Sequence, residues 1–273
     1  MRKFLVTVLL LGAIGAYFIY AISQNLQTER NDVSISINDP DVAPTSLSIA
    51  VIGDTHLPEG PEPLAAFREL LLEVKAAKPD LVLLVGDYIF DPKSEQLSAH
   101  REKIINAMKL VDPIPRAIVL GNYESWSNAD NWLAEFKRLG VNVMENEVTV
   151  LETAKGLVCV RGLGDKFTSR FGYVDYPDEC KSILKLTITH DPAGAFDRRM
   201  RGLVISGHTH CGQISLPLIR SIFAPTKAPR AAHCGKFQNE QAVIYTSSGI
   251  GNSLLDARFF AKSQIEMITV RNL

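Results

Sequence analysis

The sequence predicts an α/β fold in which two sheets pack together between helices, preceded by one transmembrane helix. Between residues 47 and 140, apolar runs of strand length alternate with runs of helical periodicity. Beyond Gly140, short strand-like runs dominate and helical signals are few. The chain also opens with a long uncharged run. A βα half followed by a strand-rich half favours two packed sheets flanked by helices.

The opening run extends from Phe4 to Ile22, 19 uncharged and mostly apolar residues after Arg2 and Lys3. At about 1.5 Å per residue, such a helix nearly spans the roughly 30 Å hydrocarbon layer. A cleaved signal peptide is the alternative, although its apolar core usually has about 7–15 residues. The two basic residues place the N-terminus in the cytosol, and in a bacterial inner membrane the body would then be periplasmic.

We therefore expect three parts: a membrane anchor or signal segment (1–23), a polar tether (24–45) and one domain (46–273). The tether has a few alternating apolar residues, which fit one edge strand. The domain is long enough to bury a large core. The net charge of −1, without a basic stripe, excludes the electrostatic signature of nucleic-acid binding. Nothing resembles a coiled coil or a swapped arm, so we expect a monomer.

The first half of the domain should contain three strands and three helices in alternation. Pro63 and Pro79 bracket the first helix, Ser94 is placed to cap the second, and Gly140 ends the third. The expected elements, in order, are strand 46–54, helix 63–78, strand 79–87, helix 94–111, strand 116–122 and helix 128–140.

The second half should consist mainly of strands. Short strands joined by turns are expected in residues 141–165, and one last helix near residues 177–184. Strands then follow at 184–190, 202–210, 241–250 and 264–270. The four cysteines form no CxxC pair, which argues against a structural zinc site. In an oxidising compartment Cys211 and Cys234 could pair; the alternative is that all four cysteines are small buried apolar residues.

Polar side chains able to bind metal follow five of the apolar runs. In α/β sheets, functional sites form at the carboxyl ends of strands, where the loops begin. One such residue is weak evidence, but five strand ends in order make a metal site the leading interpretation. The residues are Asp54 and His56, Asp87, Asn122, His190, and His208 with His210.

Seven ligands of mixed type point to two metal ions, because one ion needs only four to six. Aspartate, asparagine and histidine together favour manganese, iron or zinc over calcium or copper. Two ions about 3.5–4 Å apart can share a carboxylate and a water, and can hold the oxygens of a phosphate. The pattern therefore predicts hydrolysis of a phosphate ester or anhydride.

The motifs "GDTH", "GDY", "GNYE", "THD" and "GHTHCGQ" resemble those of the calcineurin-like metallophosphoesterase superfamily. The resemblance runs from about residue 47 to the C-terminus and is closest to the exported or membrane-linked bacterial branch. It implies a four-layer α/β/β/α sandwich with a dinuclear site at the sheet rim. By position, it implies a first ion held by Asp54, His56 and His210, a second held by Asn122, His190 and His208, and Asp87 as the bridge.

Tyr123 is a departure from the family pattern, which usually has histidine after the asparagine. A phenol with an ordinary pKa near 10 is a poor proton donor at neutral pH. Losing a general acid typically costs about 10²–10⁴ in rate, and least where the leaving group is already acidic. Three interpretations remain open. Tyr123 acts as a hydrogen-bond donor, or His233 or a metal-bound water supplies the proton instead. In the third, the tyrosine indicates that the chain has lost catalysis.

The expected catalytic pair is Tyr123 as donor and Glu124 as the residue that orients a ligand. We expect His100 to be a solvated surface residue and His233 to be a loop histidine without a role in the site. Trp126 is placed to line a substrate groove. Core packing is expected of Trp132, Phe259 and Phe260.

We expect a membrane-anchored dinuclear phosphohydrolase that cleaves phosphodiester or pyrophosphate bonds of a lipid or cell-envelope metabolite. The resemblance suggests that the branch acting on UDP-diacylglucosamine also tolerates a non-histidine residue at position 123. That step belongs on the cytosolic side, however, whereas the basic residues place this domain outside. The alternative is a catalytically impaired metal-binding domain with a scaffolding role.

Overall fold

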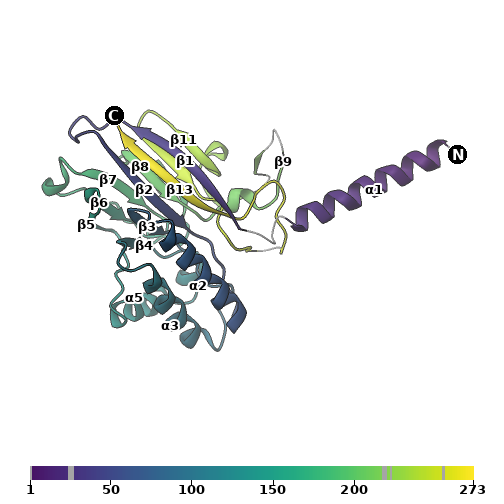
Figure 1. Ribbon diagram of the computed structural model, residues 1–273, viewed down its shortest axis with the longest axis horizontal. Helices are drawn as coiled ribbons and strands as arrows, with labels where there is room; N and C mark the ends of the chain where they lie inside the picture. Colours follow the sequence, from purple (N-terminus) through teal and green to yellow (C-terminus); the bar gives the residue numbers. More distant parts are fainter. Residues whose placement is uncertain (1, 24–27, 217–219, 222, 254–255) are drawn as a thin grey trace.

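The computed structural model describes residues 2–23, 28–216, 220–221, 223–253 and 256–273, and it contains two β-sheets packed face to face (Figure 1). The first sheet has the order β1-β13-β2-β3-β4. Strands β2, β3 and β4 are parallel, β13 is antiparallel to β2, and β1 is parallel to β13. Their bounds are β1 Glu29–Ile37, β2 Thr45–Ile52, β3 Leu81–Leu84, β4 Arg116–Ile118 and β13 Gln264–Asn272.

Strand β1 is the edge strand expected within the tether, and this expectation is confirmed. Its burial alternates along the strand, as it does in a strand with one covered face. Val33 and Ile35 join the core between the sheets. Residues 29–37 of the predicted tether therefore belong to the folded body.

Three helices cover the outer face of the first sheet, as predicted: α2 Pro61–Ala76, α3 Leu97–Ala107 and α5 Ala129–Arg138 (Figure 1). Trp132 and Phe136 are fully buried there, which confirms the core position of Trp132. Ser94 lies three residues before α3, and its hydroxyl accepts a hydrogen bond from the amide of Gln96. It stabilises the preceding turn, so the helix starts later than expected. The short helix α4, Asn122–Trp126, was not foreseen.

The second sheet has the order β11-β12-β8-β7-β6-β5, with four parallel central strands and antiparallel edges. Its bounds are β5 Glu147–Thr153, β6 Gly156–Gly162, β7 Leu184–Ile188, β8 Gly202–Ser206, β11 Gly235–Gln238 and β12 Ala242–Thr246. A further two-stranded ribbon joins β9 Ser215–Leu216 to β10 Arg220–Ser221.

The helix expected near 177–184 is wrong. Only a 3₁₀ turn, Asp178–Cys180, is present, and Leu184 already belongs to β7. Cys180 is joined to Cys159 of β6 by a disulfide. The strand pairing of β7 with β6 therefore outweighs the helical preference of this short segment.

Apolar side chains from both sheets fill the space between them, including Val51, Leu83, Leu186 and Ile205. The outer face of the second sheet is covered by loops and by the 3₁₀ turn Pro192–Phe196, over a smaller apolar cluster around Met200. The predicted layered α/β sandwich is confirmed, with a thin outer layer over the second sheet.

Both cysteine pairs are disulfides, Cys159–Cys180 and Cys211–Cys234. The pairing of Cys211 with Cys234 is therefore confirmed, and the alternative of four unpaired cysteines is wrong. The Cys159–Cys180 bond was not foreseen.

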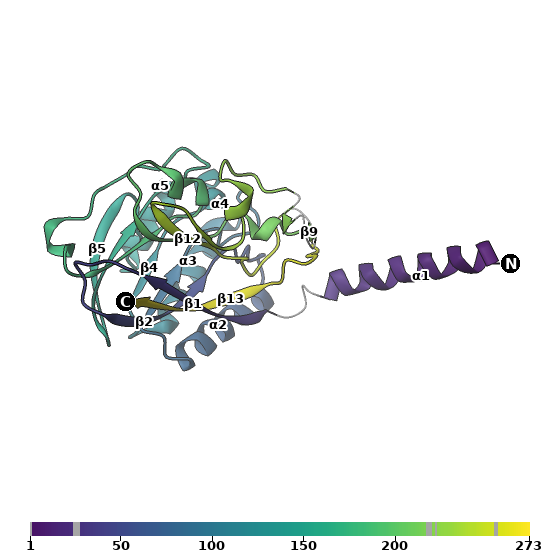
Figure 2. The same cartoon turned by 90° about the horizontal axis from the view of Figure 1, so that it is seen from above.

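Helix α1, Arg2–Ser23, projects away from the body (Figure 2). Its segment Lys3–Tyr20 is long and apolar enough to cross a membrane and is exposed along its length. Near its C-terminal end, the Tyr17 ring contacts Phe259 at 4.2 Å and Phe260 at 6.0 Å between ring centroids.

Candidate dinuclear metal site

The predicted ligands lie at one edge of the two sheets, just beyond the carboxyl ends of five parallel strands. Backbone hydrogen bonds join their loops, including Asp54 N–H to the carbonyl of Gly86 (2.9 Å) and Gly207 N–H to that of His190 (3.0 Å). All seven side chains are buried. Asp54 and His56 follow β2, Asp87 follows β3, Asn122 follows β4, His190 follows β7, and His208 and His210 follow β8.

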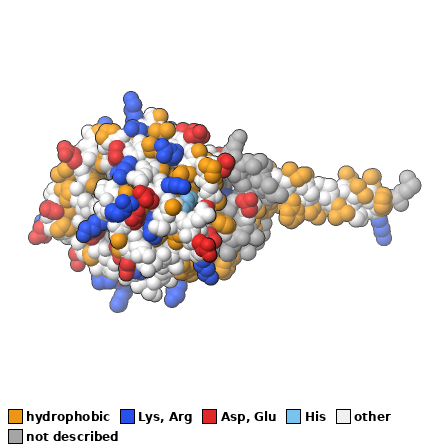
Figure 3. Space-filling model, turned by 90° about the horizontal axis from the view of Figure 1, so that it is seen from below, with side chains coloured by type: hydrophobic (Ala, Val, Ile, Leu, Met, Phe, Trp, Pro, Cys, Tyr) orange, Lys and Arg blue, Asp and Glu red, His pale blue; other side chains and the backbone are white. Residues whose placement is uncertain are grey.

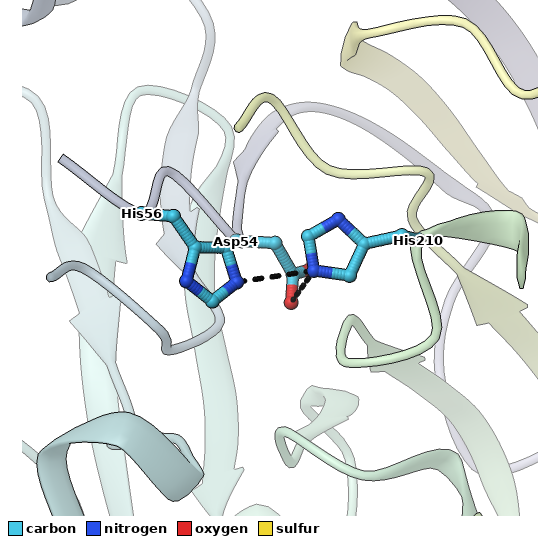
Figure 4. A group of neighbouring side chains, drawn as sticks. All are labelled: Asp54, His56 and His210. Carbon is cyan, nitrogen blue, oxygen red and sulfur yellow. Dashed lines mark hydrogen bonds and ion pairs between the residues drawn. The ribbon is translucent and has the colours of Figure 1, made fainter. Parts of the chain in front are cut away.

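Asp54, His56 and His210 form the first group, whose donor atoms lie within 4.8 Å of one another (Figure 4). Nε2 of His56 is 3.1 Å from Nε2 of His210, and Nε2 of His210 is 3.6 Å from Oδ1 of Asp54. Two imidazole nitrogens and a carboxylate thus converge on one point, which is the donor set of a divalent cation.

Asp87, His190 and His208 form the second group, with Asn122 beside them. Nε2 of His190 is 3.3 Å from Oδ2 of Asp87, 3.2 Å from Nδ1 of His208 and 3.1 Å from Oδ1 of Asn122. The same Oδ2 of Asp87 is 3.6 Å from Nε2 of His56 in the first group. Asp87 therefore lies between the two groups.

Five of the seven side chains sit on backbone with positive φ. This left-handed conformation costs non-glycine residues about 1–3 kcal/mol each, and it persists where the surroundings impose it, often at functional sites. Its concentration here indicates that the fold holds these side chains inward against a local preference. The residues are Asp54 (50°), His56 (40°), Asp87 (55°), His208 (70°) and His210 (49°).

Three of the four histidines point their outer ring nitrogen at a backbone carbonyl. A carbonyl only accepts, so that nitrogen carries a proton and the inward nitrogen is the one that faces the other ligands. The imidazoles are thus prepared to bind cations. The pairs are His56 Nδ1 with Ile89 O (3.3 Å), His190 Nδ1 with Val85 O (2.7 Å) and His208 Nε2 with Pro225 O (3.0 Å).

The fourth histidine, His210, has a different outer contact, the guanidinium of Arg258, with Nη2 at 3.1 Å from Nδ1. Arg258 is fully buried, and burial lowers its pKa to about 10. It also donates to the carbonyls of Ser248 and Ala261, so it holds this loop beside the first group. Sequence reasoning missed Arg258, for which a lone arginine before two phenylalanines is the only signal.

The electrostatics also fit two cations. Burial lowers the pKa of His56 to about 4, so its ring is neutral at pH 7. Burial raises the pKa of Asp54 to about 7, and Asp87 nearby adds to that rise. His190 lowers the pKa of Asp87 to about 2 despite its burial. Carboxylates crowded in a buried space are stabilised by the positive charge of bound metal.

Glu124 is fully buried behind the ligands. Its Oε2 accepts the backbone N–H of Asp87 (2.8 Å) and of Gly121 (2.9 Å), and its Oε1 accepts that of Tyr88 (2.8 Å). One carboxylate therefore fixes two of the ligand loops. These contacts make Glu124 a positioning residue.

Tyr123 lies at the edge of the site, with its ring 4.4 Å from that of His56 and its backbone N–H 2.9 Å from Oδ1 of Asp87. Partial burial, together with Asp87, raises the pKa of the Tyr123 phenol above its ordinary value. The phenol therefore keeps its proton at neutral pH and is able to donate a hydrogen bond.

A cavity of about 440 Å³ opens onto the ligands. Asp87, Asn122 and His208 form part of its floor. Its walls are largely apolar and include the rings of Tyr123, Trp126, Phe167 and Phe223. The predicted place of Trp126 beside a groove agrees with this lining.

Two other histidines lie outside the groups. The expectation that His100 is solvated is wrong: it is 5% exposed, and its Nε2 is 3.1 Å from the carbonyl of Leu57. It lies on the inner face of α3, where that carbonyl is available to a donor. His233 contacts the carbonyl of Ala228 at 3.0 Å, as a loop histidine does.

Residues 47–212 match the calcineurin-like phosphoesterase family. The chain belongs to this family. Membership places this phosphoesterase among the hydrolases of phosphoesters that use divalent metals.

Among its relatives, the phosphoesterase is 29% identical to the phosphodiesterase YaeI of Escherichia coli, over 70% of each chain. It is 24% identical to a zebrafish transmembrane protein with a metallophosphoesterase domain, over 97% of this chain and 62% of that protein. Its fold is similar to that of a 5′-nucleotidase precursor from Thermus thermophilus, with a TM-score of 0.50 at 14% identity, over 82% of this chain and 55% of that one.

Proposed function

We propose that this phosphoesterase hydrolyses phosphodiester or pyrophosphate bonds at a site for two divalent ions, manganese, iron or zinc. The observation that carries the proposal is the position of Asp87 Oδ2, 3.3 Å from His190 and 3.6 Å from His56, between two groups of buried donors. In this proposal Asp54, His56 and His210 would hold one ion, Asn122, His190 and His208 would hold the other, and Asp87 would be shared between them.

When bound, such ions activate a water and stabilise negative charge on a phosphate. The chain's own residues then have separate tasks. Glu124 keeps the loops of Asp87 and Gly121 in place through backbone hydrogen bonds. Tyr123, protonated at neutral pH, donates a hydrogen bond to a phosphate oxygen from the side of His56. A phenol is a weak acid, which favours substrates with acidic leaving groups such as a pyrophosphate.

The proposed substrate is a lipid or cell-envelope metabolite, of the type of UDP-diacylglucosamine. The apolar walls of the cavity and the phosphodiesterase named among the relatives support this class. The proposed location is a bacterial inner membrane, crossed once by α1, with a monomeric domain (46–273) on the periplasmic side. The basic residues Arg2 and Lys3 before the apolar run support this orientation.

The test uses the full chain in detergent, stripped of metal with a chelator and reloaded with Mn²⁺. We expect metal-dependent hydrolysis of bis-p-nitrophenyl phosphate. Asp87→Asn should abolish it, whereas Asp175→Asn, an exposed carboxylate far from the ligands, should leave it unchanged. Equal activity of the two variants would refute the dinuclear site.

The competing function is a metal-binding domain that has lost catalysis, and the variant Tyr123→His tests it. If the wild type takes up two ions per chain but shows no turnover, and Tyr123→His restores turnover, the scaffolding role becomes the better description.

A further inference from the structure

The edge of the sheets that holds the metal ligands is also the edge nearest the anchor. Strand β1 begins at Glu29, six residues after the last residue of α1, Ser23. Glu29 pairs with Gln264 of β13, and Glu266 of β13 pairs with Val51 of β2, three residues before Asp54. The register therefore places the start of β1 level with the first metal ligand.

The covalent connection is too short to separate this edge from a membrane. At about 3.6 Å per residue, the six residues from Ser23 to Glu29 span at most about 22 Å. The window Lys3–Tyr20 has 18 residues, about 27 Å of helix at 1.5 Å per residue, close to a hydrocarbon layer. If α1 crosses the bilayer, Tyr17 and Tyr20 therefore lie near its interface.

The contact between anchor and body fixes which surface reaches this interface. Tyr17 packs on Phe259 and Phe260. Phe259 exchanges backbone hydrogen bonds with Gln213 (2.9 Å) and Ser215 (2.8 Å), on either side of Ile214 in the cavity wall. Phe259 therefore lies between Tyr17 of the anchor and Ile214 of the cavity wall.

Exposed aromatic side chains surround this side of the molecule. We call Trp126, Phe167, Phe223 and Phe260 the aromatic collar; they are 55%, 41%, 65% and 44% exposed. The expected core position of Phe260 is therefore wrong, whereas Phe259 is buried. Three of the collar residues also line the cavity. Figure 3 shows a face of the body with scattered charged side chains, from which α1 projects with a mostly apolar surface.

We propose that the aromatic collar lies in the interfacial layer of the bilayer that α1 crosses, so that the cavity opens on the lipid headgroups. Aromatic rings prefer this layer, where an apolar body meets a polar surface. The occupant of the surface is a lipid membrane, argued from its continuity with the anchor through Tyr17, Phe259 and Ile214. The inference concerns binding and holds whether or not the site hydrolyses phosphodiesters.

Tryptophan fluorescence tests the proposal directly, because the chain has two tryptophans in opposite environments. Trp126 belongs to the collar, and Trp132 is fully buried. The full chain is placed in nanodiscs of phosphatidylcholine, with or without bromine atoms on the upper acyl chains. In Trp132→Phe, bromolipid should cause roughly a twofold loss of Trp126 emission, as expected of a ring at the interface. In Trp126→Phe, the emission of Trp132 should be unchanged.

A spin label provides a second measurement that does not alter either tryptophan. The four native cysteines are all in disulfides, so one added cysteine is the only free thiol. A label at Phe223→Cys should be reached by oxygen dissolved in lipid and shielded from a water-soluble nickel complex. A label at Leu157→Cys, 52% exposed at the opposite end, should show the reverse. Unquenched Trp126 or a Phe223 label in water would overturn the proposal.

Discussion

Both ends of the paired sheets are hollowed, but in different ways. The end next to the anchor has a cavity of about 440 Å³ over the predicted metal ligands, and the opposite end has one of about 700 Å³. Arg161, Tyr173 and Tyr176 line the larger cavity. The Arg161 guanidinium stacks on both rings and donates to Thr187 and to the carbonyl of Val174. The polar groups of the Arg161 side chain are thus satisfied by structural hydrogen bonds and stacking within the protein.

The backbone shows the same contrast. At the opposite end, positive φ occurs at Gly202, the first residue of β8 (80°), and at Lys78 in the turn before β3 (52°). At the ligand end, aspartate and histidine take this conformation although it disfavours them. Glycine also takes positive φ at the ligand end, at Gly86 (96°) and Gly249 (69°), but five of the seven predicted ligands do so although they are not glycine. Strain at strand ends marks the site better than the size of a cavity does.

The largest effect is expected from a glycine-to-alanine substitution at the ligand end, compared with the same substitution at the opposite end. In Gly86→Ala, the new Cβ would lie 2.6 Å from the Gly121 nitrogen and 2.7 Å from Nδ1 of His190, in a residue with φ of 96°. We expect a loss of about 3 kcal/mol in unfolding free energy and of at least about 100-fold in kcat/KM, because the ligand loops shift.

Gly202→Ala is the matched control, since its Cβ would meet no atom within 4 Å and only the positive φ opposes it. It should cost about 1 kcal/mol and leave kcat/KM unchanged. Chemical denaturation and steady-state kinetics measure both. Equal losses in the two variants would remove the distinction between the ends.

The next effect concerns the carboxylate of Glu124, which accepts three backbone N–H groups. Glu124→Gln replaces one acceptor oxygen with an amide donor, so Mn²⁺ affinity or turnover should fall about 10–100-fold. Glu240→Gln, at the rim of the opposite cavity, should change neither. Metal titration by calorimetry measures the affinity. An unaltered affinity in Glu124→Gln would show that the ligand loops keep their positions without the Glu124 carboxylate.

A smaller effect should appear as a pH dependence of stability. Burial raises the pKa of Glu266 from about 4.5 to about 7. The folded state then binds more protons than the unfolded state between these values, so the unfolding free energy falls as pH rises through this window. Glu266→Gln keeps one oxygen to accept the Ser248 N–H, its amide can donate to the Ser247 hydroxyl, and it does not titrate.

Between pH 5 and pH 8, the wild type should therefore lose on the order of 2 kcal/mol more than Glu266→Gln. Denaturant titrations of both proteins at the two pH values measure the difference. Parallel curves would mean that Glu266 is ionised throughout.

The smallest effect compares two tyrosines, one in each cavity. Tyr123→Phe should lower kcat for bis-p-nitrophenyl phosphate about tenfold. This is less than the usual 10²–10³ for an oxyanion donor because Tyr123 lies at the edge of the site and is only partly buried. Tyr173→Phe removes a hydroxyl bonded to Asp175 and should leave kcat unchanged. A Tyr123→Phe variant as active as the wild type would assign the phenol no part in the reaction.

The predicted metal ligands could be identified from the sequence, but the residues that hold them in place could not. Each predicted ligand stands at the end of an apolar run, and parallel strands necessarily bring those ends together. The contact of Arg258 with His210 spans 48 residues and depends on how a loop returns to the sheet, which no local pattern encodes. The same holds for the disulfide between Cys159 and Cys180. The helix expected near 177–184 failed because strand pairing outweighed a short local preference.

The position of β13 between β1 and β2 has a consequence for how the chain is made. The ribosome synthesises β1 early, but its partner, residues 264–272, is made only after the strands and helices between them. Strand β1 therefore has no strand partner until residues 264–272 have been made. Asn272 then closes the turn after β1, bonding Asp39 and Val42. Trimming the last ten residues would leave two open strand edges, and such edges promote aggregation.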